Sequence, residues 1–423
     1  MKRTLKLLAM ALMAGAMVTA CGGDDNGTPE PPTPPTPEGN FPDVTISNKV
    51  SGAVKVGFAD AIAITGTGFD PEQDWIELGY EKDGSMVYER VTADVLTFKK
   101  TRVAFGIGIT ATFLDKTVKV YLNRMGYDPM PLTGDITFTM PTVAEGYIPD
   151  PAFRATLNSD HPQEGNPAIK PLFNAYGLLD VEAAGKLTEG GHEGYGINLY
   201  NCKATSLEGI ELFKSVTGLI PAWGMENLKE VDLSKWMAKK VDLRFNDLPK
   251  LEKFIGSPYA YRVDVYKCPN LKYVDLNLCK WCYNVQLFFD ESPTQYSSVT
   301  YLDVRRQRTG TLKLGDADTN PNTELRYPTD PAIDYSILLS GVWMKVAANC
   351  HILIDYQYLL DKKTNTQQDG YGTIFSAWQR GATIDVYASK NITKKIGTVP
   401  LFSVDPNALT ISGENGWKVN DPQ

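Results

Sequence analysis

The stretch "LKYVDLNLC" (residues 271–279) contains the pattern on which the fold of this chain depends. Apolar residues stand at its first, fourth and sixth positions, Leu271, Val274 and Leu276, and a cysteine closes it. Apolar and polar residues that alternate over such a short run indicate a β-strand with one buried face. A strand this short cannot bury that face alone, so the pattern predicts similar segments beside it.

The pattern recurs along the middle of the chain. Its match to L-x-x-L-x-L-x-x-N/C resembles bacterial leucine-rich-repeat proteins, and "YIPDPAFRATL" (residues 147–157) resembles the helical lead-in of that family. The resemblance implies a leucine-rich-repeat solenoid over residues 145–325. The further copies are "INLYNC" (197–202), "VDLSKW" (231–236), "VDLRFN" (241–246), "VDVYKC" (263–268), "VQLFFD" (285–290) and "LDVRRQ" (302–307).

The spacing of the copies predicts two walls. Consecutive copies lie ten or eleven residues apart, whereas one solenoid turn needs roughly 20 residues, so alternate copies must fall on opposite sides. One parallel ladder is predicted to contain Val241, Val263 and Val285, which are 22 residues apart. The other wall is predicted to contain Leu233, Phe254 and Leu276.

The same alternation predicts a binding face. If the ladder valines point inward, the intervening residues form exposed columns, one of them Asp242, Asp264 and Gln286. Exposed aromatic rings in register suit stacking on a sugar or on a partner side chain, although they would also pack on adjoining loops. The predicted binding residues are Arg244, Tyr266 and Phe288 in one column, with Tyr261 and Trp281 nearby.

The repeat also accounts for most of the cysteines. Cys202, Cys268 and Cys279 occupy its N/C position, where a small side chain points inward beneath the turn, so structural thiols are predicted. The C-x-x-C in "CKWC" (residues 279–282) leaves a redox pair or half a zinc site open. No second pair or nearby histidine completes a zinc site, and no thioredoxin-like context surrounds the motif.

Residues 43–142 predict an antiparallel β-sandwich. "AIAITGTGFD" (61–70), "WIELGY" (75–80), "TVKVYL" (117–122) and "DITFTM" (135–140) alternate apolar with polar or small residues between turn signals. The phrases "ITGTGFDPEQDWIEL" (64–78) and "ITFTMP" (136–141) resemble IPT/TIG immunoglobulin-like domains, in which this module is commonly a spacer or a dimerisation unit.

The N-terminal residues predict export and lipidation. Lys2, Arg3 and Lys6 precede an apolar run over residues 7–18, which is shorter than the roughly 20 residues that span a bilayer. Residues 18–21, "VTAC", resemble the lipobox of bacterial lipoproteins, which implies a signal peptide over residues 1–20 and a lipid on Cys21. An ordinary secretory signal with a chance cysteine is the alternative.

The residues after Cys21 predict a tether at the outer membrane. Asp24 and Asp25 resemble the acidic tag of lipoproteins that face the cell exterior, although a solvated linker is the other reading. "TPEPPTPPTPEG" (residues 28–39) favours extended polyproline II. Residues 21–42 are therefore predicted to be an acidic, Pro-rich tether.

Composition and motifs narrow the function classes. The formal net charge of −8 argues against nucleic acid and against charge-driven membrane binding. His161, His192 and His351 lie in no metal motif, and no nucleophile elbow, P-loop or dinucleotide fingerprint is present. "GDADTNPNTE" (residues 315–324) has calcium-loop spacing, but Pro321 replaces the required glycine. No cofactor and no metal are predicted.

The predicted fold class is therefore mainly β: an immunoglobulin-like β-sandwich, then a leucine-rich-repeat solenoid, then an irregular β C-terminal region. Residues 326–423 are predicted to hold irregular repeats and a cap, with strands at "VWMKVAANC" (342–350), "HILIDY" (351–356), "ATIDVYAS" (382–389) and "NALTISGENGW" (407–417). A separate small β domain is the alternative there.

The predicted function is non-enzymatic. The chain is expected to be a surface-anchored lipoprotein that binds extracellular protein partners, in adhesion or recognition, and to contact the membrane through its N-terminal lipid only. The alternative is a glycan-capture lipoprotein of a polysaccharide-utilisation system. A polysaccharide hydrolase is a third reading, because paired carboxylates could be any of the chain's 50 acidic residues.

Overall fold

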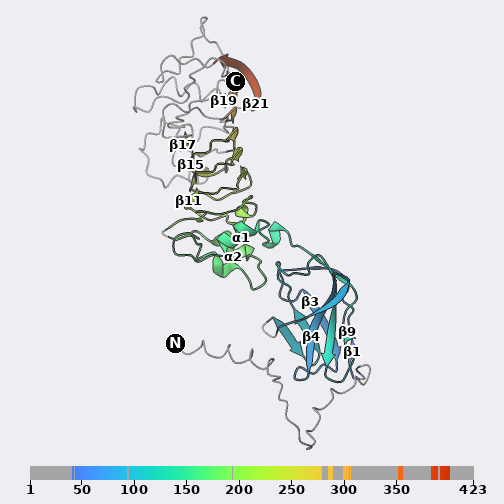
Figure 1. Cartoon of the computed structure of the whole chain (residues 1–423). Helices are drawn as coiled ribbons and strands as arrows, with labels where there is room; N and C mark the ends of the chain where they lie inside the picture. Colours follow the sequence, from blue (N-terminus) through green and yellow to red (C-terminus); the bar gives the residue numbers. More distant parts are fainter. Residues whose placement is uncertain are drawn as a thin grey trace, which may run out of the picture.

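The computed structural model describes residues 41, 43–92, 95–192, 194–278, 284–288, 299–303, 305, 351–355, 383–388 and 391–400. The described chain is mainly β, as the sequence predicts. Figure 1 shows two parts, a unit of two β-sheets followed by a pile of short parallel strands, with a small helical region between them. We call these parts the two-sheet unit and the strand stack.

The two-sheet unit contains the first ten strands. One sheet has the order β1-β3-β7-β6, and the other has the order β2-β10-β8-β4-β5, with β9 paired to β8. Nearly all neighbouring strands are antiparallel, and β2 and β10 are the parallel exception. The strands are β1 (Thr45–Ile46), β2 (Gly52–Lys55), β3 (Ile62–Thr67), β4 (Asp74–Lys82), β5 (Ser85–Arg90), β6 (Leu96–Lys99), β7 (Arg102–Phe105), β8 (Thr117–Arg124), β9 (Met130–Pro131) and β10 (Ile136–Thr139).

Alternation along these strands builds one shared core. Ile64, Ile76 and Val120 come from β3, β4 and β8 and are fully buried in it. The glycines at 66 and 68 have a steric role, because a Cβ at either position would collide with a backbone oxygen, that of Thr45 or Asp43. These glycines therefore allow the start of the described chain to lie directly against β3.

The helical region lies at the base of the strand stack. Asp150 caps helix α1, since its Oδ1 accepts the N–H groups of Ala152 and Phe153 at 2.9 Å. Phe153 and Leu157 on α1 are fully buried in the core of the stack. The helical elements are the 3-10 turns η1 (Val143–Glu145), η2 (Lys170–Leu172) and η3 (Ile210–Leu212) and the helices α1 (Pro151–Leu157) and α2 (Val181–Lys186).

From β11 to β18, successive strands of the stack alternate between two sheets, as the spacing of the repeats predicts, whereas β18 to β21 all lie in one sheet. The β11 sheet has the order β11-β13-β15-β17, and the β12 sheet has the order β12-β14-β16-β18-β19-β20-β21. All neighbours are parallel except the β20–β21 pair. The strands are β11 (Gly218–Trp223), β12 (Glu230–Asp232), β13 (Val241–Asn246), β14 (Lys253–Ile255), β15 (Ala260–Tyr266), β16 (Tyr273–Asp275), β17 (Asn284–Phe288), β18 (Tyr301–Asp303), β19 (His351–Asp355), β20 (Thr383–Ala388) and β21 (Asn391–Pro400).

The register of the β11 sheet corrects one predicted ladder. Val263 does pair with Val285, but Val241 lies opposite Ala260, and Leu243 takes the place beside Val263. Val241 and Ala260 are 19 positions apart, and the register shift between Val241 and Asp242 makes the separation 20 for the following pairs, so it never reaches the predicted 22. Equal spacing of valines in the sequence is therefore not equal register in the sheet.

The β12 sheet corrects the other predicted wall. Phe254 pairs with Val231 and Val274, not with Leu233 and Leu276. The two leucines follow strands β12 and β16 and are still almost fully buried. A second wall is therefore present, but the middle residue of each three-residue strand forms it, in place of Leu233 and Leu276.

Two cysteines of the repeat are buried as predicted. Cys202 and Cys268 are free thiols, 2% and 0% exposed, within the core of the stack. Cys279 and the rest of the C-x-x-C motif lie outside the described residues, as do the predicted strands at 342–350 and 407–417. The strands predicted at 351–356 and 382–389 are present as β19 and β20.

The two-sheet unit and the stack are joined by a loop that enters the first core. Leu178 is 3% exposed and packs among the core residues of the two-sheet unit. Asn174 donates from its side chain to the backbone oxygen of Gly57 at 2.9 Å, and the N–H of Ile109 donates to the oxygen of Tyr176 at 3.1 Å. The loop over residues 174–178 is therefore a plug that fixes one part against the other. Among the described residues, no helix has the length and apolar character to cross a membrane.

Candidate functional site

The three residues of the predicted binding column do not lie in one row of the observed sheet. Arg244 lies beside Asp264 of β15, whereas Tyr266 pairs with Asn246 and Phe288. Arg244 thus belongs to a different row from the two aromatic residues, because residues of β13 pair with residues of β15 that lie 20 rather than 22 positions later. The side chains of Tyr261, Tyr266 and Phe288, together with all of Trp281 and Cys21, lie outside the described residues.

Arg244 forms part of a charge network on the β11 sheet. Its side chain is half-buried and contacts Asp242 at 2.8 Å and Asp264 at 3.7 Å. Arg262 also contacts Asp264, at 2.6 Å. Asp264, predicted to be exposed, is fully buried beneath the two arginines, and this burial raises the pKa of its carboxyl group. Two guanidinium groups held over one carboxylate give this surface a fixed arrangement of charge.

The opposite sheet carries a row of aromatic side chains that the sequence analysis does not predict. Tyr273 of β16 and Tyr301 of β18 stack face to face, with ring centroids 4.5 Å apart and an interplanar angle of 2°. The Lys253 ammonium lies 5.8 Å from the centroid of the Tyr273 ring, and His351 meets Tyr301 edge-on. The signal was present in "YVD" and "YLD", where a tyrosine twice precedes the buried middle residue of a strand.

An acidic row lies beside the tyrosines. Asp275 and Asp303 are register partners, and the Tyr273 and Tyr301 hydroxyls donate to them at 3.4 and 3.3 Å. Burial, with the nearby Asp303 adding to it, raises the pKa of Asp275. Arg305 contacts Asp303 at 2.6 Å and supplies a counter-charge for this part of the row.

A third charged group lies further along the same sheet. Asp385 of β20 is 3% exposed and contacts both the His351 ring and the Lys395 ammonium at 2.6 Å. Asp264, Asp303 and Asp385 are thus each in contact with at least one arginine, lysine or histidine side chain. Such pairing holds the side chains in one geometry, which is the property that a recognition surface needs.

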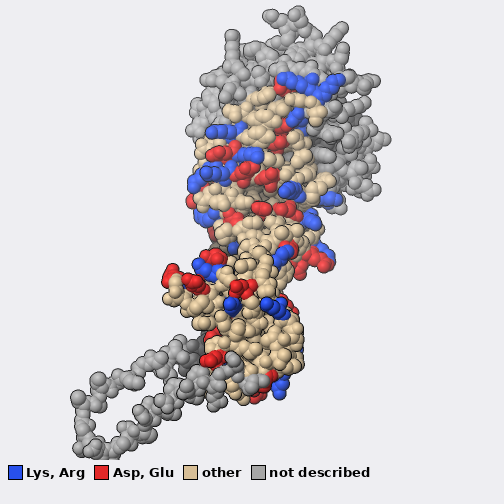
Figure 2. All heavy atoms as spheres, turned by 90° about the vertical axis from the view of Figure 1, so that its right-hand side faces the viewer, with Lys and Arg blue, Asp and Glu red and all other residues tan. Residues whose placement is uncertain are grey.

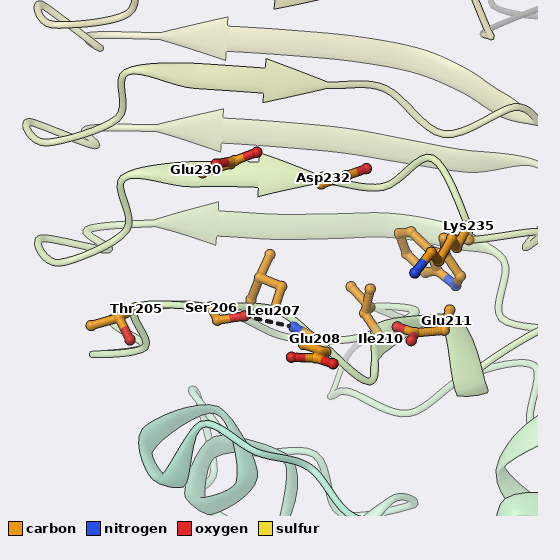
Figure 3. A pocket seen from close by; sticks show the side chains of 10 residues that line it. Thr205, Ser206, Leu207, Glu208, Ile210, Glu211, Glu230, Asp232 and Lys235 are labelled. Atoms are coloured by element: carbon orange, nitrogen blue, oxygen red, sulfur yellow. Dashed lines mark hydrogen bonds between the residues drawn. The ribbon is translucent and has the colours of Figure 1, made fainter. Parts of the chain in front are cut away.

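A pocket of about 360 Å³ opens where the β12 sheet begins. Figure 3 shows β12, with Glu230 and Asp232, on one side and the segment over residues 205–211 on the other. The lining contains four carboxylate side chains and one ammonium group, so it is acidic. The lining residues are Thr205, Ser206, Leu207, Glu208, Ile210, Glu211, Glu230, Asp232, Lys235 and Trp236.

Hydrogen bonds to Asp150 fix the segment over residues 205–211, which forms one wall of the pocket. Asp150 Oδ2 accepts the N–H and the hydroxyl of Thr205 at 2.8 Å and the N–H of Ser206 at 3.2 Å. Burial alone would raise the pKa of Asp150, but the donors from Phe153, Thr205 and Ala152 outweigh it and lower that pKa. The same carboxylate that caps α1 therefore fixes the position of the pocket's lower rim.

No group of three or more His, Cys, Asp or Glu side chains within the described part of the chain has the arrangement of a metal site. The calcium-like segment at 315–324 lies outside the described residues. The pocket, the charge network and the tyrosine row combine fixed charge with aromatic surface.

Comparison of the chain with family models, with curated proteins and with solved structures gave no significant match.

Proposed function

We propose that this chain is a surface-anchored, non-enzymatic lipoprotein that binds extracellular protein partners through its strand stack. In this proposal, the two-sheet unit is an immunoglobulin-like domain of the IPT/TIG type that acts as a spacer. The stack is a leucine-rich-repeat solenoid continued by an irregular β C-terminal region. Alternation of parallel strands between two sheets, one pair to a turn, supports the solenoid.

One observation carries the proposed binding function: the outward side chains of the stack are held in register by the backbone. The pairs Arg244–Asp264 and Tyr273–Tyr301 each lie on neighbouring parallel strands. Figure 2 shows basic and acidic side chains mixed over the stacked strands and fewer of them on the two-sheet unit. A surface already ordered loses little conformational entropy on association, and mixed charges favour a complementary protein over a polyanion.

The test is a binding screen of the soluble chain from Asp43 onward against extracellular-matrix proteins, with a glycan array in parallel. We expect a protein partner, bound more weakly at high salt because charged rows contribute. Arg244→Ala should weaken that binding, whereas Arg102→Ala, which removes an exposed arginine of the two-sheet unit, should leave it unchanged. Retention on glycans alone, or equal effects of the two variants, would contradict the proposal.

A second candidate function, glycan capture, is favoured by the outer face of the two-sheet unit. Tyr88 and Tyr121 lie edge to face over Gly79, with centroids 5.5 Å apart, and Tyr88 is 48% exposed. Nearby, Glu77 accepts hydrogen bonds from Trp75 Nε1 at 2.9 Å and Asn123 Nδ2 at 3.2 Å. Aromatic rings beside polar groups on a flat sheet are suited to the apolar face and the hydroxyl groups of a sugar.

Affinity electrophoresis in gels that contain soluble polysaccharides tests the second candidate. Retardation that is lost in Tyr88→Ala but kept in Met86→Ala, an equally exposed neighbour, would support it. Equal mobility with and without polysaccharide would leave protein binding as the function of the chain.

A further inference from the structure

The pocket at the start of the β12 sheet has two features that are independent of each other. The first is its charge, since the lining includes the acidic residues Glu208, Glu211, Glu230 and Asp232 but only one basic residue, Lys235. Lys253 pairs with Glu230 at 2.5 Å and offsets one of these charges. Four carboxylates less two ammonium groups leave a net charge of about −2. The pocket is therefore complementary to a cation.

The second feature is the free edge of the sheet. Strand β12 is the first of its sheet and pairs on one side only, with β14. The N–H of Lys253 bonds to the oxygen of Lys229, and the N–H of Leu233 bonds to the oxygen of Ile255. Backbone groups alternate in direction along a strand, so those of Glu230 and Asp232 point away from β14. Within the described residues these groups have no backbone partner, and they lie at the pocket.

The lining also offers apolar contact. Leu207, Ile210 and Trp236 line the pocket beside the carboxylates, and the edges of Leu207 and Ile210, which are 5% and 2% exposed, are the parts of them that a ligand can reach. A lysine or arginine side chain has an apolar stem and a charged head, so it matches a pocket of this mixed character. An extended backbone carrying that side chain matches the free hydrogen-bonding groups of the sheet edge.

We propose that the pocket beside β12 binds a lysine or arginine side chain on an extended segment of the protein partner. This inference rests on the proposed function, because it names where and how that partner is held. The edge of β12 supplies hydrogen bonds that are independent of the partner's sequence, and the carboxylates select the cation. Asp232 is suited to this role because hydrogen bonds from Ser234 fix it, one of them from the Ser234 N–H to Oδ1 at 2.9 Å.

Isothermal titration of the chain from Asp43 onward with the peptide acetyl-Thr-Val-Lys-Val-Thr-amide tests the inference. We expect a dissociation constant of about 1 mM or lower for this peptide. Binding should be lost when the lysine is acetylated, because acetylation removes the positive charge while the apolar stem of the side chain is kept. N-methylation of alternate peptide bonds should also weaken binding, because it removes donors that the sheet edge would accept.

Protein variants locate the site. Asp232→Asn and Glu211→Gln keep the acceptors for Ser234 and Gly209 but remove the charges, and each should weaken binding of the lysine peptide about two- to fivefold. Lys235→Met should strengthen it, because a like charge leaves the pocket. Asp115→Asn, which removes an exposed charge of the two-sheet unit, is the matched control and should have no effect.

The outcomes separate this inference from the proposed function. Equal binding of lysine and acetyl-lysine peptides, equal affinity of Asp232→Asn and Asp115→Asn, or no binding at about 1 mM would overturn the inference. A protein partner that is bound normally by the double variant Asp232→Asn, Glu211→Gln would retain the proposed function and overturn the pocket's role. Peptide binding without any protein partner in the screen would instead count against the proposed function alone.

Discussion

At the scale of single residues, Asp150 links two elements that are far apart in the sequence. Its Oδ1 caps helix α1, and its Oδ2 holds Thr205 and Ser206 at the rim of the pocket. A buried carboxylate with this many donors is tolerated because each donor replaces a bond to water. Its removal would leave those N–H groups without an acceptor.

We therefore expect Asp150→Ala to lower the free energy of unfolding by about 2–3 kcal/mol. Because the folded-state pKa of Asp150 is lowered, its contribution is present above the unfolded pKa, about 3.9, and is lost as the pH falls through the folded value. Urea unfolding at neutral pH and in acid measures both effects. A variant that loses stability equally at both pH values would show that packing, not charge, is responsible.

The buried thiols allow a second prediction at this scale. Burial raises the pKa of Cys268 to about 12, so almost none of it is thiolate near neutral pH, and the thiolate is the form that alkylating reagents attack. Iodoacetamide should label Cys202 and Cys268 slowly in the native protein and quickly after denaturation. Cys268→Ser should destabilise the fold by about 1–3 kcal/mol, because a more polar hydroxyl group replaces a thiol that is fully buried in an apolar core. Rapid native labelling would place these thiols at the surface.

At the scale of elements, strand positions are easier to predict than strand register. The alternation in "VDLRFN" and "VDVYKC" is enough to place β13 and β15 on one wall, because strand periodicity is local. The register shift between Val241 and Asp242 is not a local property, because it depends on which residues of β15 pair with those of β13. The pocket was also missed, because it joins residues 205–211 to β12 and no single motif marks it.

The observed register changes which residues lie in one row with the aromatic side chains. Tyr266 and Phe288 still pair with each other, and Asn246 rather than Arg244 continues their row. We expect Tyr266→Ala and Phe288→Ala each to weaken partner binding by about 1 kcal/mol or more with little change in stability. Titration and thermal unfolding of each variant are the measurements. A large loss of melting temperature would show that these rings are internal.

At the scale of the whole molecule, the plug over residues 174–178 connects the two cores. Leu178 belongs by sequence to the region of the stack but packs in the two-sheet unit, so the predicted boundary near residue 142 does not mark where contacts end. Gly57 and Gly177 lie tightly against Leu178 and Ile109 in this junction. No sequence periodicity marks the plug, because its residues follow the shape of another part of the chain.

Leu178→Ala should loosen this junction. Truncation of a buried leucine costs about 2–5 kcal/mol, and here the cost falls on the contact between the two parts. Hydrogen–deuterium exchange should rise at Ile109, whose N–H bonds to Tyr176. Leu276→Ala, a truncation within the stack, is the control and should leave exchange at Ile109 unchanged.

The proposed lipid anchor makes a separate prediction for the intact cell. Cys21→Ala should leave the chain unacylated and release it from the membrane fraction, because no acyl chain then holds it there. Fractionation and mass spectrometry of the N-terminal peptide test this. A wild-type chain without lipid, together with a variant that stays in the membrane fraction, would rule out the lipoprotein proposal.

The plug also has a mechanical consequence. A ligand held by the stack and pulled by flow would exert a torque about the junction, and a flexible hinge there would let the stack align with the force. Leu178, clamped beside Gly57, resists that rotation, so the described parts should transmit load as one stiff lever. In a single-molecule pulling experiment, the junction should therefore yield with a distinct force peak, and Leu178→Ala should lower that peak.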